Sequence, residues 1–369
     1  MSQDKKESYK KLALNLNKMP IGFPPTKSGV EIKLLQELFT SIEAEIASVL
    51  KFAPEPLNKI RERIEYLELS ENELEKILDG MYFKGLINRI IKKSDNVKKK
   101  IYSSAPLALG FFEYQVNHLT EDFIDHFEQY YDEGFIEELN KTGIPQLRTI
   151  PIGKSISYEQ NIATYDELRK IIELSEGVIS VANCVCRQVK DIKGDPCKKT
   201  DMRELCFQFR TSAKSFNEKG QARMISKEEA LEILEKAEEA GLVLQPGNSQ
   251  RPHCLCCCCG CCCEVLVNQK KMPNPAQFFA TNYYAQVDET LCVSCGTCEE
   301  KCNMEAIMIE DIATIDLNRC IGCGACVPAC PEDALSLKKK EDERIPPKDA
   351  ISTYAAIMQK KTELADKEK

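Results

Sequence analysis

The residues of this chain best suited to chemistry are its cysteines: 20 of the 369 residues are cysteine, and eight of these lie between Cys254 and Cys263. A thiolate is a soft ligand for metals such as iron, zinc and copper. The chain has only three histidines, His118, His126 and His253, which leaves little imidazole for acid–base catalysis. The composition therefore indicates chemistry at bound metals.

One cysteine spacing, C-x2-C-x2-C-x3-C, occurs twice near the C-terminus. The two runs consist of Cys292, Cys295, Cys298 and Cys302, then of Cys320, Cys323, Cys326 and Cys330. Each cysteine of the second run lies 28 positions after its counterpart, and the flanking residues repeat too, since Val287-Asp288 returns as Ile315-Asp316. Such self-similarity indicates that one folding unit has been duplicated.

This double run resembles bacterial ferredoxin domains with two clusters, over about residues 284 to 340. In that pattern the fourth cysteine of each run starts a short helix and ligates the cluster of the other run. The resemblance implies one [4Fe-4S] cluster on Cys292, Cys295, Cys298 and Cys330, and another on Cys320, Cys323, Cys326 and Cys302. Pro331 follows the last cysteine as the pattern requires, whereas Asn303 stands where the first run would have proline. The alternative, zinc, usually takes two C-x2-C pairs.

Twelve further cysteines form a central set. The first four, Cys184, Cys186, Cys197 and Cys206, follow C-x-C-R-x9-C-x8-C and could enclose one metal centre, with Arg187 and Lys190 offsetting its negative charge. The other eight are Cys254, Cys256, Cys257, Cys258, Cys259, Cys261, Cys262 and Cys263. They exceed the need of one four-iron cluster, so some join a second centre or complete the first. We expect at least one additional iron–sulfur cluster here; zinc and, for the first four, free thiols are the alternatives.

The N-terminal region has no cysteine from Val30 to Ser103 and shows helical spacing. One predicted helical stripe consists of Leu35, Leu38, Ile42, Ile46 and Leu50. Ser70 and Glu73 form a capping box that opens a helix ending at Gly85. Two strands, Leu86–Ile91 and Lys98–Ser103, can then pair across a polar turn at residues 94–96. This order resembles a winged helix-turn-helix domain.

The charges of this region argue against sequence-specific DNA binding. The helix that would enter the major groove carries Glu71, Glu73, Glu75 and Asp79 against Lys76 and Lys84. Such a helix repels phosphate, although the predicted wing is basic through Lys92, Lys93, Lys98, Lys99 and Lys100. We expect a protein-docking or structural module, with DNA binding as the alternative.

Composition and motifs limit the remaining choices. The net charge is −8, no tryptophan occurs, and no run approaches the roughly 18 apolar residues of a membrane span. Residues 1–25 have no apolar signal core, so we expect a cytoplasmic protein whose thiols are reduced. The many thiolates that could bind oxygen-labile clusters favour an anaerobic cell. No P-loop, GxGxxG or flavin motif appears, so hydride or ATP chemistry would need a partner subunit.

The expected fold is an α+β multidomain chain. Its parts are an N-terminal extension (1–29), a winged-helix-like domain (30–103), a cysteine-rich mixed α/β central domain (104–275), a ferredoxin domain (276–340) and a tail helix (341–369). In the central domain, a strand at Gly177–Ala182 leads to Cys184, and a second capping box, Ser226 with Glu229, opens a helix that Gly241 ends.

Three segments in this order extend the resemblance to most of the chain. They are Asn183-Cys184-Val185-Cys186-Arg187, Glu239-Ala240-Gly241-Leu242-Val243 and Cys254-Leu255-Cys256-Cys257. Together with the double run they resemble a family of 4Fe-4S dicluster proteins of archaea and anaerobic bacteria. That family implies iron–sulfur electron transfer, but it implies no particular reaction. The run Cys256–Cys259 is denser than the family's usual pattern, so the ligands in this loop stay open.

The sequence therefore predicts an electron carrier or oxidoreductase subunit. It would relay single electrons through two [4Fe-4S] clusters to or from a central metal centre, and it would need a redox partner protein. One alternative is a redox-sensing winged-helix regulator; the other is a reductase whose active site is the central cluster. No catalytic residue is assigned. His253, which lies beside Cys254, is a candidate metal ligand or proton donor; the alternative is that it has no role at the metal site.

Overall fold

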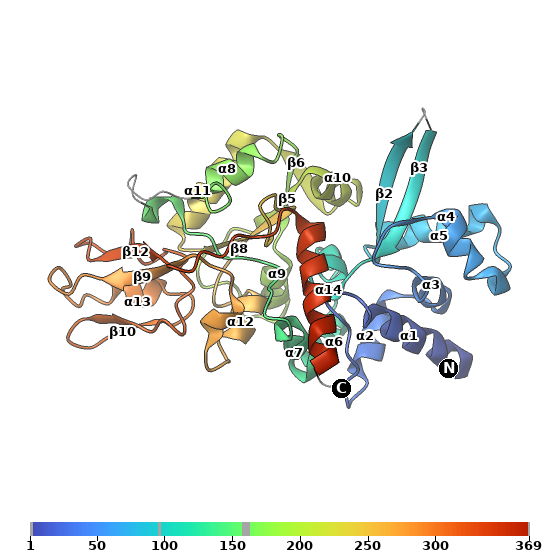
Figure 1. Cartoon of the computed structure of the whole chain (residues 1–369), viewed down its shortest axis with the longest axis horizontal. Coiled ribbons are helices and arrows are strands. Elements are labelled where there is room, and N and C mark those ends of the chain that lie inside the picture. The colour runs from blue at the N-terminus through green and yellow to red at the C-terminus, as the bar shows by residue number, and fades with distance from the viewer. Residues whose placement is uncertain (1–2, 95–96, 157–162, 368–369) are drawn as a thin grey trace. The chain divides into compact units, whose positions relative to one another are not determined.

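The computed structural model describes residues 3–94, 97–156 and 163–367 (Figure 1). The chain forms two compact units, Met1–Thr142 with Ile357–Lys369 and Gly143–Ala356. Residues 104–142 thus group with the N-terminal region, while the cysteine-rich and ferredoxin-like segments share the second unit. Among the described residues, no helix combines the length and apolar character needed to cross a bilayer.

The first unit begins with short helices rather than one long stripe. Its helices are α1 (Gln3–Leu16), α2 (Val30–Leu38), α3 (Ser41–Ala47), α4 (Leu57–Glu62), α5 (Glu71–Phe83), α6 (Glu121–Tyr130) and α7 (Ile136–Asn140). The predicted continuous stripe from Leu35 to Leu50 is wrong, because Thr40 and Glu43 form a capping box that starts a new helix. The predicted capping box of Ser70 and Glu73 is present at the start of α5.

A three-stranded antiparallel sheet follows α5 and contains the predicted hairpin. Its strands are β1 (Glu55–Pro56), β2 (Ile87–Ser94) and β3 (Val97–Ser104), in the order β1-β3-β2. The turn residues Asp95 and Asn96 lie outside the described residues. Asp79 of α5 accepts hydrogen bonds from Arg89 (2.7 Å), Lys100 (2.6 Å) and Tyr102 (3.0 Å), so it ties the helix to both long strands.

The second unit is built on a five-stranded antiparallel sheet of order β6-β4-β5-β8-β7. The strands are β4 (Ile179–Asn183), β5 (Glu204–Phe209), β6 (Ala222–Ile225), β7 (Val243–Pro246) and β8 (Cys254–Cys258). The accompanying helices are α8 (Leu168–Glu173), α9 (Val185–Ile192), α10 (Arg210–Glu218), α11 (Lys227–Glu239) and α12 (Glu264–Gln269). Ser226 accepts the N–H of Glu229 at the start of α11, which is one half of the predicted capping box, while the Glu229 carboxylate pairs with Arg223. Phe207, Phe209 and Leu255 lie in the apolar core beside this sheet.

The ferredoxin-like segment consists of short strands and one short helix. Its elements are β9 (Tyr283–Val287), α13 (Thr297–Lys301), β10 (Ile307–Ile309), β11 (Ala313–Ile315) and β12 (Leu335–Lys339). β9 pairs with β12 and β10 with β11, so each pair joins one strand from each half of the repeat. The expectation that the fourth cysteines begin helices is wrong: Cys302 is the C-cap of α13, and Cys330 lies outside any helix.

The tail helix runs as α14 from Ala350 to Lys367, within the segment 341–369 that was expected to hold it. Its first residues belong to the second unit and its last residues to the first. In the second unit Thr353 donates a hydrogen bond to the carbonyl of Asn248 (2.7 Å). In the first unit Lys361 pairs with the buried carboxylate of Glu138.

Candidate metal centres

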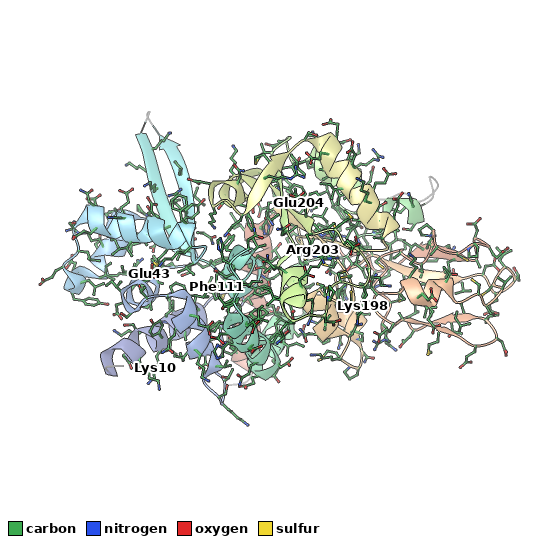
Figure 2. The ribbon with its side chains drawn as sticks, turned by 180° about the vertical axis from the view of Figure 1, so that it is seen from behind. Lys10, Glu43, Phe111, Lys198, Arg203 and Glu204 are labelled. Atoms are coloured by element: carbon green, nitrogen blue, oxygen red, sulfur yellow. The ribbon has the colours of Figure 1, made fainter. Side chains whose placement is uncertain are left out.

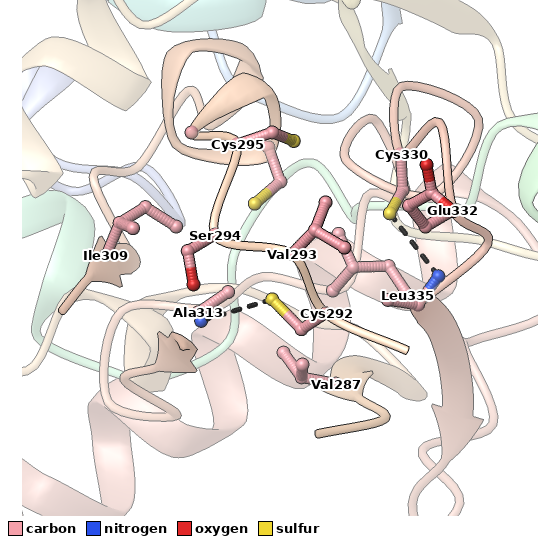
Figure 3. A pocket seen from close by; sticks show the side chains of 13 residues that line it. Val287, Cys292, Val293, Ser294, Cys295, Ile309, Ala313, Cys330, Glu332 and Leu335 are labelled. Atoms are coloured by element: carbon pink, nitrogen blue, oxygen red, sulfur yellow. Dashed lines mark hydrogen bonds between the residues drawn. The ribbon is translucent and has the colours of Figure 1, made fainter. Parts of the chain in front are cut away.

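Two cavities lie in the ferredoxin-like segment, and each is lined by four cysteines. The outer cavity is lined by Cys292, Cys295, Cys298 and Cys330, so it combines three cysteines of the first run with the last cysteine of the second (Figure 3). The inner cavity is lined by Cys302, Cys320, Cys323 and Cys326, which is the reciprocal combination. The two are similar in size, with empty volumes of about 340 and 370 Å³.

Backbone amides point at the cysteine sulfurs of both cavities, and they do so symmetrically. The amide of Ala313 donates to Cys292 Sγ and that of Ala285 to Cys320 Sγ, both at 3.4 Å. A second type of bond joins each fourth cysteine to the amide four residues later, at 3.2 Å for Cys302 and 3.3 Å for Cys330. The two bonds of each type are related by the 28-residue repeat, because each donor and each acceptor lies 28 positions from its counterpart in the other half. Amides in these places would stabilise thiolates that carry metal.

The outer and inner cavities differ in their exposure. Cys295 is exposed, and the backbone N–H of Thr297 lowers the pKa of its thiol. In the inner cavity, burial raises the pKa of Cys323 to about 12. Buried thiols with raised pKa values favour the neutral form until a metal displaces the proton. The inner set therefore fits ligands that are deprotonated by a bound metal, and the outer set lies nearest to solvent.

Comparison with known proteins agrees with this geometry. A family model for 4Fe-4S binding domains (Fer4) matches residues 313–336, which span β11, the second cysteine run and the start of β12. The match supports a ferredoxin-like iron–sulfur protein. Searches of curated proteins and of solved structures gave no match.

Ten of the twelve central cysteines fall into two groups, of four and of six, which sequence spacing alone does not reveal; Cys254 and Cys257 belong to neither group. Four of them, Cys197, Cys259, Cys261 and Cys262, have all their sulfur atoms within 4.8 Å of one another. Cys197 thus lies with the loop cysteines and not with Cys184, Cys186 and Cys206. It is brought there by the irregular segment between α9 and β5, which carries Lys198 and Arg203 (Figure 2).

The second central group is larger and more extended. Hydrogen-bonded thiol pairs link its members in the order Cys184, Cys186, Cys263, Cys258, Cys256 and Cys206. Cys184 lies at the N-cap of α9, Cys206 in β5, and Cys256 and Cys258 in β8. Alternation along β8 puts Cys254 on the same face as Cys256 and Cys258. Cys257 points to the opposite face, where it is buried in the apolar core and burial raises its pKa.

Arg187 is the buried cation of the central site. Its guanidinium is 1% exposed, donates to Cys259 Sγ at 3.3 Å and to the carbonyl of Cys257 at 2.9 Å. Together with hydrogen bonds led by that from Cys262, this cation lowers the pKa of Cys259 to about 5. Arg187 thus lies where a cation stabilises the Cys259 thiolate, and its expected role in offsetting the charge of a metal centre stays a prediction.

Asn303, which departs from the ferredoxin pattern, connects the first cysteine run to the cysteine-rich loop. Its side chain is buried, accepts the N–H of Gly260 at 2.9 Å and donates to the carbonyl of Gly241 at 2.7 Å. A Cβ on Gly260 would lie 2.2 Å from the Asn303 carbonyl oxygen, so only glycine fits there. Sequence reasoning found the departure but not this role.

Replacing Asn303 with alanine is expected to loosen that connection. The change leaves the Gly260 N–H and the Gly241 carbonyl without their bonds to this side chain, which costs about 1–3 kcal/mol for each group left buried. The unfolding midpoint of the second unit, followed anaerobically by visible absorbance, should fall. Asn318→Ala, at an exposed position, serves as the control and should change little. Equal midpoints for the two variants would contradict the role given to Asn303.

His253 is half-buried and lines a small cavity with Gln146, Asn248 and Ser249. Burial, followed by the charge of Arg210, lowers its pKa to about 4, so the imidazole is neutral at physiological pH. None of the cysteines of the two groups lines that cavity among the described residues.

Proposed function

We propose that this protein carries single electrons between a redox partner and a central metal centre, by way of two [4Fe-4S] clusters. The outer cluster is assigned to Cys292, Cys295, Cys298 and Cys330, and the inner one to Cys302, Cys320, Cys323 and Cys326. Each such cluster supplies a one-electron redox couple when bound. The central centre is assigned to the six-cysteine group around Cys256.

The observation that carries this proposal is a shared apolar core. Cys258 and Cys263 of the six-cysteine group are buried in a cluster with Leu266, Phe279 and Ile321. Cys302, Cys320 and Cys323 of the inner cavity pack against the same cluster, and so does Cys256. A shared water-poor core supports direct electron exchange between the metal centres that we assign to the two cysteine sets. The outer cavity, in turn, is joined to the inner one through the apolar cluster that contains both Cys298 and Cys326.

Partner docking is assigned to the exposed end of the ferredoxin-like segment. Cys295 is exposed there, and the neighbouring apolar side chains Leu291, Val293 and Met308 are about half exposed, at 47%, 60% and 55%. Exposed apolar groups beside a charged rim are typical of transient interfaces. Glu299, Glu300 and Glu332 supply that rim. A partner with a basic surface around an apolar patch fits this end.

The regulator alternative is weaker because the basic wing is internally neutralised at its base. Lys100 forms ion pairs with Glu75 (2.9 Å) and Asp79 (2.6 Å), and Arg89 pairs with Asp79. These acidic groups lie on α5, the helix that a winged-helix protein would place in the major groove. The reductase alternative keeps the same electron path and differs only in an open coordination site at the six-cysteine group.

The proposal is tested by metal analysis and spectroscopy of the full chain purified without oxygen. We expect about eight irons from the two ferredoxin-like clusters, further iron in the central group, and sulfide in matching amount. EPR during stepwise reduction should show the ferredoxin-type signals and an additional one. A total of eight irons with no further signal would remove the central acceptor from the scheme, and fewer than eight would contradict the two-cluster assignment.

A further inference from the structure

The four-cysteine group consists of Cys197, Cys259, Cys261 and Cys262, whose sulfur atoms lie close together. Among the parts of the chain that the structure describes, Cys197, Cys259, Cys261 and Cys262 form the one group of three or more whose ligand atoms all lie within 4.8 Å of one another. The cysteines of the two ferredoxin-like cavities do not meet that condition, and neither do those of the six-cysteine group. The tight group therefore differs in kind from the others.

Its sulfur–sulfur distances match a single tetrahedral ion. Cys197 Sγ lies 3.6 Å from Cys259 Sγ and 3.9 Å from Cys261 Sγ. Cys261 Sγ lies 3.4 Å from Cys259 Sγ and 3.6 Å from Cys262 Sγ. Four sulfurs around one zinc at ~2.3 Å form a tetrahedron with edges of about 3.8 Å. In a four-iron cluster each thiolate binds a different iron, so the sulfurs stand farther apart.

We infer that Cys197, Cys259, Cys261 and Cys262 bind one zinc ion in a closed tetrathiolate site. Zinc is favoured over mononuclear iron(II), because a given set of ligands binds zinc more tightly. Four thiolates around a divalent cation leave a charge of −2, which the buried guanidinium of Arg187 reduces through its bond to Cys259. The site has no open position, as expected for a structural zinc.

The local fold shows what the ion would hold together. Cys197 lies in the irregular segment between Ile192, the end of α9, and Glu204, the start of β5. This segment is fixed at one end by Arg203, which donates to Asp191 at 2.6 and 2.9 Å. The other three cysteines lie in the turn after β8. The ion would join the segment to that turn, and would leave the six-cysteine group as the redox centre.

The test compares two alanine variants of the full chain, purified anaerobically from medium that contains both metals. Cys261→Ala removes one proposed ligand, and Cys257→Ala is the matched control, since Cys257 belongs to neither group. We expect about one zinc per chain in the wild type and in Cys257→Ala. In Cys261→Ala, zinc should be lost while iron and sulfide stay unchanged. Loss of iron and sulfide in place of zinc, or retention of zinc, would overturn the inference.

Zinc-edge X-ray absorption of the wild-type protein decides the matter even where a variant fails to fold. Four sulfur neighbours at ~2.3 Å, with no nitrogen or oxygen and no second metal nearby, are expected. A mixed sulfur and nitrogen shell would exclude this site, because no histidine belongs to the four-cysteine group. Absence of zinc with a mononuclear iron spectrum would also overturn the choice of ion.

Discussion

Replacing Cys302 with alanine is expected to destroy the cluster of the second cysteine run and to spare the cluster of its own run. Cys302 shares its cavity with Cys320, Cys323 and Cys326, and not with Cys292. Loss of this thiolate should remove about four irons per chain. Because the inner set alone packs against the core that holds Cys258 and Cys263, reduction of the central centre by an external donor should slow sharply as well.

The measurement uses two reference variants, each of which removes a cysteine in the middle of one run. Cys323→Ala defines the spectrum of a protein without its inner cluster, and Cys295→Ala defines that of a protein without its outer cluster. The EPR spectrum of reduced Cys302→Ala should match the Cys323→Ala reference. A match to the Cys295→Ala reference would show that the fourth cysteines are not exchanged between the runs. Cys257→Ala controls for the loss of any buried thiol.

Replacing Asp166 with asparagine is expected to cause the largest loss of stability in the second unit. Asp166 pairs with the guanidinium of Arg148, and both residues are 1% exposed. Asn282, the residue before β9, also donates to Asp166 at 3.0 Å, so this bond holds the start of β9 to the segment before α8. Removing one partner of a buried ion pair costs about 3–5 kcal/mol, because the remaining charge is left in a medium that solvates it poorly.

Anaerobic denaturant unfolding, followed by visible absorbance of the clusters, measures this loss as a shift of the midpoint. Asp342→Asn makes the same chemical change at an exposed position and should stay within about 0.5 kcal/mol of the wild type. The double variant Arg148→Met with Asp166→Leu should be more stable than Asp166→Asn, since it removes both charges. Equal unfolding midpoints for Asp166→Asn and Asp342→Asn would show that the ion pair of Arg148 and Asp166 does not stabilise the fold.

The cysteines that line the two ferredoxin-like cavities could be grouped from the sequence because short loops hold most of each set together; their role as cluster ligands stays a prediction. Three cysteines of each run lie within seven residues of one another, and the exchange of the fourth is what the resemblance to two-cluster ferredoxins implies. Capping residues at Ser70 and Ser226 were equally readable, because a helix start depends on contacts three residues apart. The break at Thr40 was missed, since the apolar spacing continues across it.

The central cysteines were harder to read because tertiary structure divides them. Cys197 is separated from Cys259 by 62 positions, and only the pairing of β5 with β8 brings their neighbourhoods together. Within β8, side chains alternate between the two faces, so Cys256 belongs to the six-cysteine group whereas Cys257 lies in the apolar core. Sequence density therefore indicated metal binding without showing which thiols share an ion.

Asn303 links the cysteine-rich loop to the first cysteine run of the ferredoxin-like segment. It follows Cys302 directly and holds Gly260, which lies between Cys259 and Cys261. A displacement of the loop at Gly260 would therefore shift Asn303, the residue next to Cys302 of the inner cavity. A displacement at Cys302 would likewise shift the loop. Such coupling is reciprocal: if metal binding in the loop changes the free energy of reduction of the inner cluster, reduction changes the free energy of metal binding by the same amount. Through the side-chain amide of Asn303, the zinc occupancy of the loop and the reduction potential of the inner cluster would then depend on each other.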